Sequence, residues 1–138
     1  MRWLLGDSSF LSKLNANGSQ LIYSSFFSGG HSGETTQTTS LMVDLSGNIW
    51  LAGMTHDSQF PMIHPIQSVP ASDNPSFPGF VAELDSTGSQ LKFSTFMGDL
   101  SQGAQNLKIA PDRDGKIHFG GVTGWEQYVS PGTSIASV

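Results

Sequence analysis

An internal repeat constrains this chain more than any other feature of its sequence. Residues 10–26 return 70 positions later as residues 80–96, and eight of the 17 aligned positions are identical. Conservative exchanges, such as Tyr23 for Phe93, extend the match. Repetition of this kind is typical of architectures in which similar units stack on one another. We therefore expect two copies of one structural unit.

A second pair of segments belongs to the same repeat. Residues 41–43 align with residues 107–109. The following segment, 47–55, aligns with 115–123, which makes the intervening turn two residues longer in the second copy. Between the copies, the stretch 56–78 holds five of the seven prolines. Because proline removes a hydrogen-bond donor from a β ladder, this stretch is expected to be a connector.

Each copy predicts four short β-strands. Runs of about 4–8 β-branched and aromatic residues are bounded by Gly, Asn, Asp and Ser. The turns end in glycine, which adopts positive φ without steric cost. No segment shows a clean helical period, so almost no helix is expected. The expected strands are 9–14, 20–27, 40–44 and 48–54 in the first copy and 79–85, 90–97, 106–110 and 116–122 in the second.

Tandem units of four antiparallel strands are the way in which β-propeller blades are built. The sequence therefore predicts an all-β chain of two four-stranded blades belonging to a larger propeller. The expected organisation is a first blade over 7–55, a Pro-rich connector over 56–78, a second blade over 79–123, and a tail or start of a next connector over 124–138.

Three motifs in this repeat resemble a known family. The first is Phe-x-x-x-Leu-Asn/Asp-x-x-Gly-Ser-x-Leu-x-Tyr/Phe-Ser-Ser/Thr-Phe, and the second is the run from Val43 to Thr55. The third is Ser58-Gln-Phe60-Pro61. Together they resemble the bacterial SBBP repeats, which form seven-bladed β-propellers, over residues 7–66 and 79–123. The resemblance implies a secreted or cell-surface protein and no catalytic residues that transfer to this chain.

The resemblance has one departure, in the turn that begins at Asp112. Lys116 stands where the family usually has Asn after the turn glycine, so the geometry of this turn is left open.

Two blades alone leave apolar faces open to water, because a propeller closes with about 4–8 blades. The first expectation is that the chain is a fragment of a longer propeller. One alternative is a ring in which roughly three or four copies supply the blades by self-association. A second alternative is a two-blade stub of marginal stability.

Composition excludes several classes of function. The net charge of −5 and six basic residues argue against nucleic-acid binding, which needs clustered Lys and Arg. The absence of cysteine excludes disulfides and thiolate metal sites. No stretch approaches the roughly 20 apolar residues of a membrane span. The start also lacks the apolar run of a signal peptide, so either the chain is not exported by that route or its true N-terminus is missing.

The sharpest acidic motif is Asp112-Arg-Asp114-Gly115. Asp112 and Asp114 make it a candidate calcium turn, but a calcium loop needs more oxygen ligands and a closing Glu. A hairpin turn capped by Asp and Gly is the competing interpretation.

The histidines give weaker signals for a metal site. His31 and Glu34 lack the His-Glu-x-x-His spacing, and their surroundings indicate a polar loop. His56 and His64 lie in the Pro-rich connector, where surface positions are common. His118 stands at the repeat position of Trp50 and is expected to be partly buried. No metal site is assigned.

Two tryptophans are of the residue type that contacts ligands. Trp50 lies in the middle of an expected strand, which favours core packing, whereas Trp125 follows a strand and is a candidate contact for a sugar ring. With 21 serines, a Ser-His-Asp set carries no information without geometry, and no Gly-x-Ser-x-Gly elbow is present. No catalytic residue and no cofactor are assigned.

The leading functional hypothesis is a non-enzymatic propeller repeat module of a secreted or cell-surface bacterial protein, presenting loops to a protein or glycan partner. The alternative is a fragment of a propeller enzyme whose active site lies at the axis and needs further blades. A spacer in a long surface protein is a third interpretation. Self-association through open blade faces, or further blades in a longer chain, is expected in each case.

Overall fold

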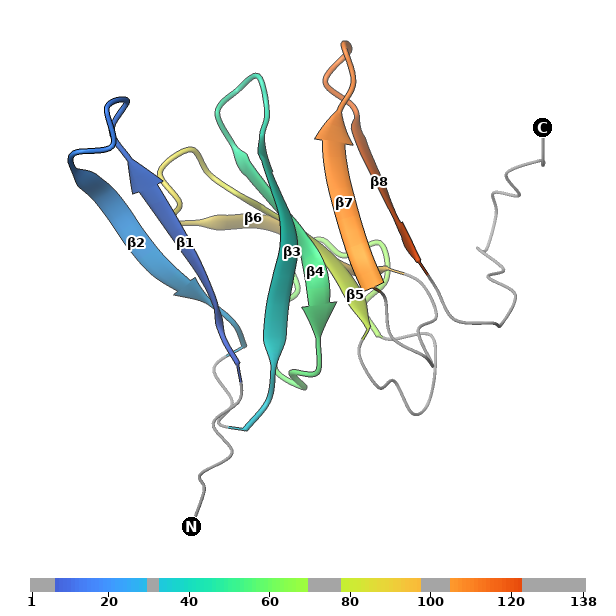
Figure 1. Ribbon diagram of the computed structural model, residues 1–138. Coiled ribbons are helices and arrows are strands. Elements are labelled where there is room, and N and C mark those ends of the chain that lie inside the picture. Colours follow the sequence, from blue (N-terminus) through green and yellow to red (C-terminus); the bar gives the residue numbers. More distant parts are fainter. Residues whose placement is uncertain (1–6, 30–32, 70–77, 98–104, 123–138) are drawn as a thin grey trace.

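The computed structural model describes residues 7–29, 33–69, 78–97 and 105–122, and these form eight antiparallel β-strands in three sheets. The described part contains no helix, and hence none of the length and apolarity needed to span a membrane. The all-β prediction is confirmed (Figure 1). The strands are β1 (Ser9–Leu14), β2 (Leu21–Phe27), β3 (Thr36–Val43), β4 (Ile49–Thr55), β5 (Gly79–Leu84), β6 (Leu91–Met97), β7 (Gln105–Pro111) and β8 (Ile117–Val122).

Seven of the eight strands begin and end within about one residue of their predicted bounds. The exception is β3, which begins at Thr36 rather than at residue 40. This extension pairs Thr36 with Thr55 at the end of β4, and their hydroxyl oxygens lie 2.9 Å apart in the interior. A register shift between Thr38 and Ser40 accommodates the added residues. The polar run that looked like loop therefore continues a strand.

The prediction that each repeat forms one four-stranded sheet is wrong, because the strands are grouped differently. The central sheet has the order β3-β4-β5-β6, so it joins the second half of the first copy to the first half of the second. The pairs β1–β2 and β7–β8 form two-stranded sheets on opposite sides of it (Figure 1). The structural unit is therefore shifted by two strands from the sequence repeat.

The Pro-rich connector hydrogen-bonds to the central sheet. Thr55 at the end of β4 donates its N–H to the carbonyl of Pro78, which continues the pairing of β4 with β5. The connector also lies along β6, because the N–H groups of Ser94 and Phe96 donate to the carbonyls of Ile63 and Gln67 at 2.9 and 3.1 Å. It thus satisfies backbone groups on the outer edge of the central sheet.

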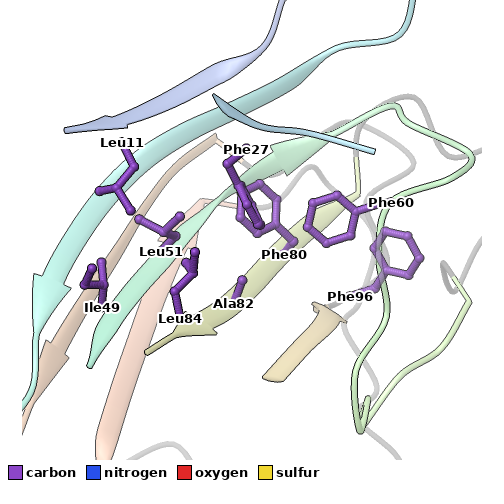
Figure 2. Close-up of a cluster of buried hydrophobic side chains, with 9 residues drawn as sticks. All are labelled: Leu11, Phe27, Ile49, Leu51, Phe60, Phe80, Ala82, Leu84 and Phe96. Atoms are coloured by element: carbon purple, nitrogen blue, oxygen red, sulfur yellow. The ribbon is translucent and has the colours of Figure 1, made fainter. Parts of the chain in front are cut away.

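Two apolar clusters hold the three sheets face to face. The first lies between β1–β2 and the central sheet, where Leu11 and Phe27 point toward Leu51 and Phe80 (Figure 2). The rings of Phe27 and Phe80 are 5.7 Å apart. The second lies between the central sheet and β7–β8. Its buried members are Met42, Ala52, Val81, Leu107 and Ile109.

The turn that opens at Asp112 has the same length as the turn that opens at Asp44, which corrects the predicted two-residue difference. In the first, the N–H of Asp44 donates to the carbonyl of Asn48, and in the second Asp112 donates to Lys116. Each turn thus spans five residues between paired strands. Repeat positions in these two hairpins are therefore 68 residues apart, whereas residues 10–26 and 80–96 are 70 apart.

Candidate functional site

The hairpin turns gather at one end of the sheets. Figure 1 shows the turns of β1–β2, β3–β4 and β7–β8 at the same end. The turn between β5 and β6 joins them, because a Cβ placed on Gly47 would lie 3.4 Å from Ser86 and one on Gly88 would lie 2.8 Å from the ring of Tyr23. This turn end contains the strongest candidates for a functional surface.

Asn15 and Asp85 build two of these turns in the same way. The Oδ1 atom of Asp85 accepts the N–H groups of Ser89 and Gln90 at 2.8 and 3.1 Å. The Oδ1 atom of Asn15 makes the corresponding bonds at 2.9 and 3.2 Å. The hydroxyl of Thr87 donates to Asp85 at 2.7 Å and, together with those N–H groups, lowers the pKa of Asp85 to about 2.

Asp44 and Asp112 build the other two turns. Trp50 Nε1 donates to Asp44 at 3.1 Å, and His118 Nε2 lies 3.0 Å from Asp112. The bond from His118 is the main cause that lowers the pKa of Asp112. For Asp44, burial raises the pKa, but bonds from Trp50 and the N–H of Asn48 outweigh it, so the pKa is lowered.

A groove near this end is lined by residues of β1–β2 and of the central sheet with two of its turns, and it has a volume of about 170 Å³. Leucine, valine and isoleucine side chains make most of its lining apolar, and exposed Lys13, half-buried Tyr23 and exposed Ser86 also line it. Burial raises the pKa of the Tyr23 phenol, and the negative charge of Asp85 raises it further, so this hydroxyl stays a hydrogen-bond donor at neutral pH. The lining residues are Leu11, Ser12, Lys13, Tyr23, Leu41, Val43, Gly47, Ile49 and Ser86.

In the candidate calcium turn, the protein itself engages the carboxylate of Asp112. Asp112 accepts the N–H groups of Asp114 and Lys116 at 2.9 and 2.8 Å, in addition to its contact with His118. Asp114 is exposed, 4.0 Å from the Lys116 ammonium. Within the described ranges, no three His, Cys, Asp or Glu side chains gather as a metal site would require. This geometry is that of a capped hairpin turn.

The structure corrects the prediction for His118, whose side chain is 69% exposed rather than partly buried. The reason is its place on β8, which pairs only with β7 among the described strands. Trp50, on the corresponding strand of the complete central sheet, is half-buried and lies 6.1 Å from the ring of Phe93.

The remaining candidate site residues either do not come together or lie outside the described residues. His31 and Trp125 lie outside the described residues. Glu34 accepts the N–H of Ser58 at 2.6 Å and therefore ties two loops together. His56 and His64 are exposed, as their place in the connector predicts.

Sequence reasoning missed the groove at the turn end. Lys13 and Tyr23 lie opposite each other on β1 and β2, and both adjoin the Asn15 turn. In the sequence, neither residue stands out from the rest of the repeated segment 10–26. Their position with Ser86 around one groove depends on how the sheets pack, and no local pattern in the sequence encodes it.

Comparison with family models, with curated proteins and with solved structures finds no match to this chain.

Proposed function

We propose that this chain is a non-enzymatic repeat module of the β-propeller type, from a secreted or cell-surface bacterial protein, that binds a protein or glycan partner at its turn end. The face-to-face packing of three antiparallel sheets supports the propeller assignment, because propeller blades pack in this way. The resemblance of the repeat to the SBBP family supports the cellular location.

The groove between the turns is the observation that carries the binding proposal. Its volume of about 170 Å³ lies below the roughly 300–1,000 Å³ of pockets that enclose a whole small molecule. It suits one inserted side chain or one sugar ring. An apolar floor beside the Tyr23 phenol and the Lys13 ammonium matches a group with an apolar body and a polar or acidic tip.

The engagement of the carboxylates at this end supports a non-enzymatic role. Asp44, Asp85 and Asp112 accept hydrogen bonds from the side chains of Trp50, Thr87 and His118 respectively, and these bonds together with the N–H groups of each turn lower the pKa of each carboxyl. A general acid or base works best with a pKa near the working pH. The pKa of each of these three carboxyls is instead shifted away from neutral pH, and their hydrogen bonds stabilise the turns.

The test is a binding screen of the full chain against a displayed peptide library and a glycan array, followed by groove variants. We expect Lys13→Ala to weaken binding by about tenfold or more. Tyr23→Phe, which keeps the packing and removes the hydroxyl, should weaken it less. Lys116→Ala is the matched control, because this exposed lysine lies on another turn, outside the groove. Binding that is equally insensitive to Lys13→Ala and Lys116→Ala would refute the groove as the site.

A further inference from the structure

The two flanking sheets are repeat copies of the two halves of the central sheet. β1–β2 corresponds to β5–β6, since eight of 17 aligned residues are identical and the turns form the same bonds. β7–β8 corresponds to β3–β4, since Asp112 repeats the role of Asp44. In the central sheet, these two halves are joined by the pairing of β4 with β5. Therefore β8 is the counterpart of β4, and β1 is the counterpart of β5.

We propose that the free edge of β8 pairs with the free edge of β1 in a second copy of this chain, so that two half-sheets form one complete four-stranded sheet. Among the described strands, β1 pairs only with β2 and β8 only with β7. The central sheet lies between the two halves, so they do not meet within one copy (Figure 1). Unpaired strand edges are templates for pairing with another chain. This inference rests on the sheet-stacking part of the proposed function.

The apolar face of β1–β2 supports a second copy as the partner. Phe10 is 73% exposed and Phe26 is 81% exposed, and both lie on the face opposite Leu11 and Phe27. Their counterparts in the central sheet, Phe80 and Phe96, are 0% and 8% exposed. Such a pair of exposed rings is typical of a surface that another protein covers.

The central sheet of a second copy presents what would cover these rings. Phe80 packs against Phe27, whose repeat counterpart is Met97. If neighbouring copies stack as these sheets do, the face that carries Phe10 and Phe26 packs against the face of the next copy's central sheet that carries Val81 and Met97. Met97 packs only partly buried against the second cluster there, together with Trp50 and Phe93.

The register follows from the β4–β5 pairing. Gly53 faces Phe80 in the central sheet, and the transferred register places Gly121 opposite Phe10. A glycine opposite a phenylalanine is thus preserved. His118 opposite Lys13 is the pair that departs from the central pattern of Trp50 opposite Glu83. The full transferred set is Ile117 with Leu14, His118 with Lys13, Phe119 with Ser12, Gly120 with Leu11, Gly121 with Phe10, and Val122 with Ser9.

This pairing is head-to-tail, so it closes rings or runs on as an open array. Each copy brings one central sheet and completes one joint sheet. A ring of roughly two to four copies would therefore contain the 4–8 sheets of known propellers.

The experiment uses disulfide trapping, because the chain has no cysteine of its own. In the double variant Ser12→Cys with Phe119→Cys, the two cysteines face each other across the proposed joint, within the 4.4–6.8 Å between Cα atoms that a disulfide needs. The matched control is Ser24→Cys with Phe119→Cys. Ser24 faces Ser12 on β2, one strand further from the edge, and each variant removes the same 2.8 Å contact between their hydroxyls.

We expect covalent dimers and higher multiples of the 14.7 kDa chain on a non-reducing denaturing gel for the Ser12 variant, and at least about tenfold less for the Ser24 variant, since disulfide formation depends steeply on distance. Equal cross-linking of the two variants, or cross-linking of neither, overturns the proposal. Hydrogen exchange on the same samples distinguishes a failure of the proposed joint from a failure of the sheet stacking. A protected central sheet without selective cross-linking refutes the joint alone, whereas an unprotected central sheet refutes the stacking on which the proposed function depends.

Discussion

The central sheet and its flanking half-sheets carry nearly the same sequence in very different surroundings. Phe80 on β5 is 0% exposed, while Phe10, at the same repeat position on β1, is 73% exposed. Leu84 and Leu14 repeat the contrast at 7% and 55%. The difference comes from neighbours, because β5 lies between two strands and behind a second sheet. Burial in this fold is therefore a property of the completed sheet and not of the repeat motif.

The half-sheets nevertheless bury apolar side chains on the faces that they turn toward the central sheet. Leu11 and Phe27 point toward the central sheet and are 5% and 8% exposed. Ile109 on β7 does the same on the other side, at 8%. Each half-sheet thus has one face in a core and one face in water. This arrangement leaves the outer faces of the half-sheets open for association.

The largest predicted effect comes from truncating the same residue in the two settings. Phe80→Ala removes a ring that packs 4.8 Å from Phe60, so the free energy of unfolding should fall by about 3–5 kcal/mol. Phe10→Ala should change it by no more than about 0.5 kcal/mol in dilute, monomeric protein. Urea denaturation measures both. Equal losses would mean that the two half-sheets and the central sheet do not differ as described.

Two glycines on different sheets, Gly53 on β4 and Gly120 on β8, give the next effect. A Cβ on Gly53 would lie 2.0 Å from the carbonyl oxygen of Gln37, whereas one on Gly120 meets nothing within 4 Å. Gly53→Ala should therefore destabilise the protein by roughly 1–3 kcal/mol because the backbone must shift. Gly120→Ala should be neutral or stabilising by about 0.4–1 kcal/mol, because alanine restricts the unfolded chain. Thermal unfolding of both variants tests this, and a loss of stability in Gly120→Ala would show that β8 is packed more tightly than described.

A smaller effect concerns acid stability in the paired turns of Asn15 and Asp85. Because the folded-state pKa of Asp85 is lowered to about 2, its contribution is present above the unfolded-state pKa of about 3.9. It is lost as the pH falls through the folded value. Asp85→Asn should flatten the loss of stability over this window, and Asn15→Asp should steepen it. Unfolding curves between pH 5 and about 2 measure the slope, and an unchanged slope in both variants would contradict the assignment.

The smallest effect is local to the turns of Asp44 and Asp112. Since the hydrogen bond from His118 lowers the pKa of Asp112, His118→Ala should raise that pKa toward the usual value for aspartate. Trp50→Phe should raise the pKa of Asp44 in the same way, because it removes the indole donor. Side-chain carboxyl NMR titrations would detect both shifts. A pKa of Asp112 that is unchanged in His118→Ala would show that the turn's own N–H groups suffice.

The local elements of this fold were predictable from sequence, and the pairing between them was only partly so. Strand bounds and turns follow from short patterns, such as the glycine that closes each Asn or Asp turn. The pairing of β4 with β5 joins strands from different repeats across the connector, which no periodicity in the sequence reports. The groove was missed for a similar reason. Tyr23 and Ser86 line the same groove only because two sheets pack face to face.

Amide hydrogen exchange, followed residue by residue by NMR on the full chain, tests the central claim most directly: the structural unit straddles the repeat boundary. The account predicts that the amides of β4 and β5 are protected together and lose protection together in Phe80→Ala. It also predicts rapid exchange at the outer edges of β1 and β8 in dilute protein. Protection shared by β2 and β3, with β5 opening independently of β4, would contradict the account and place one sheet in each repeat.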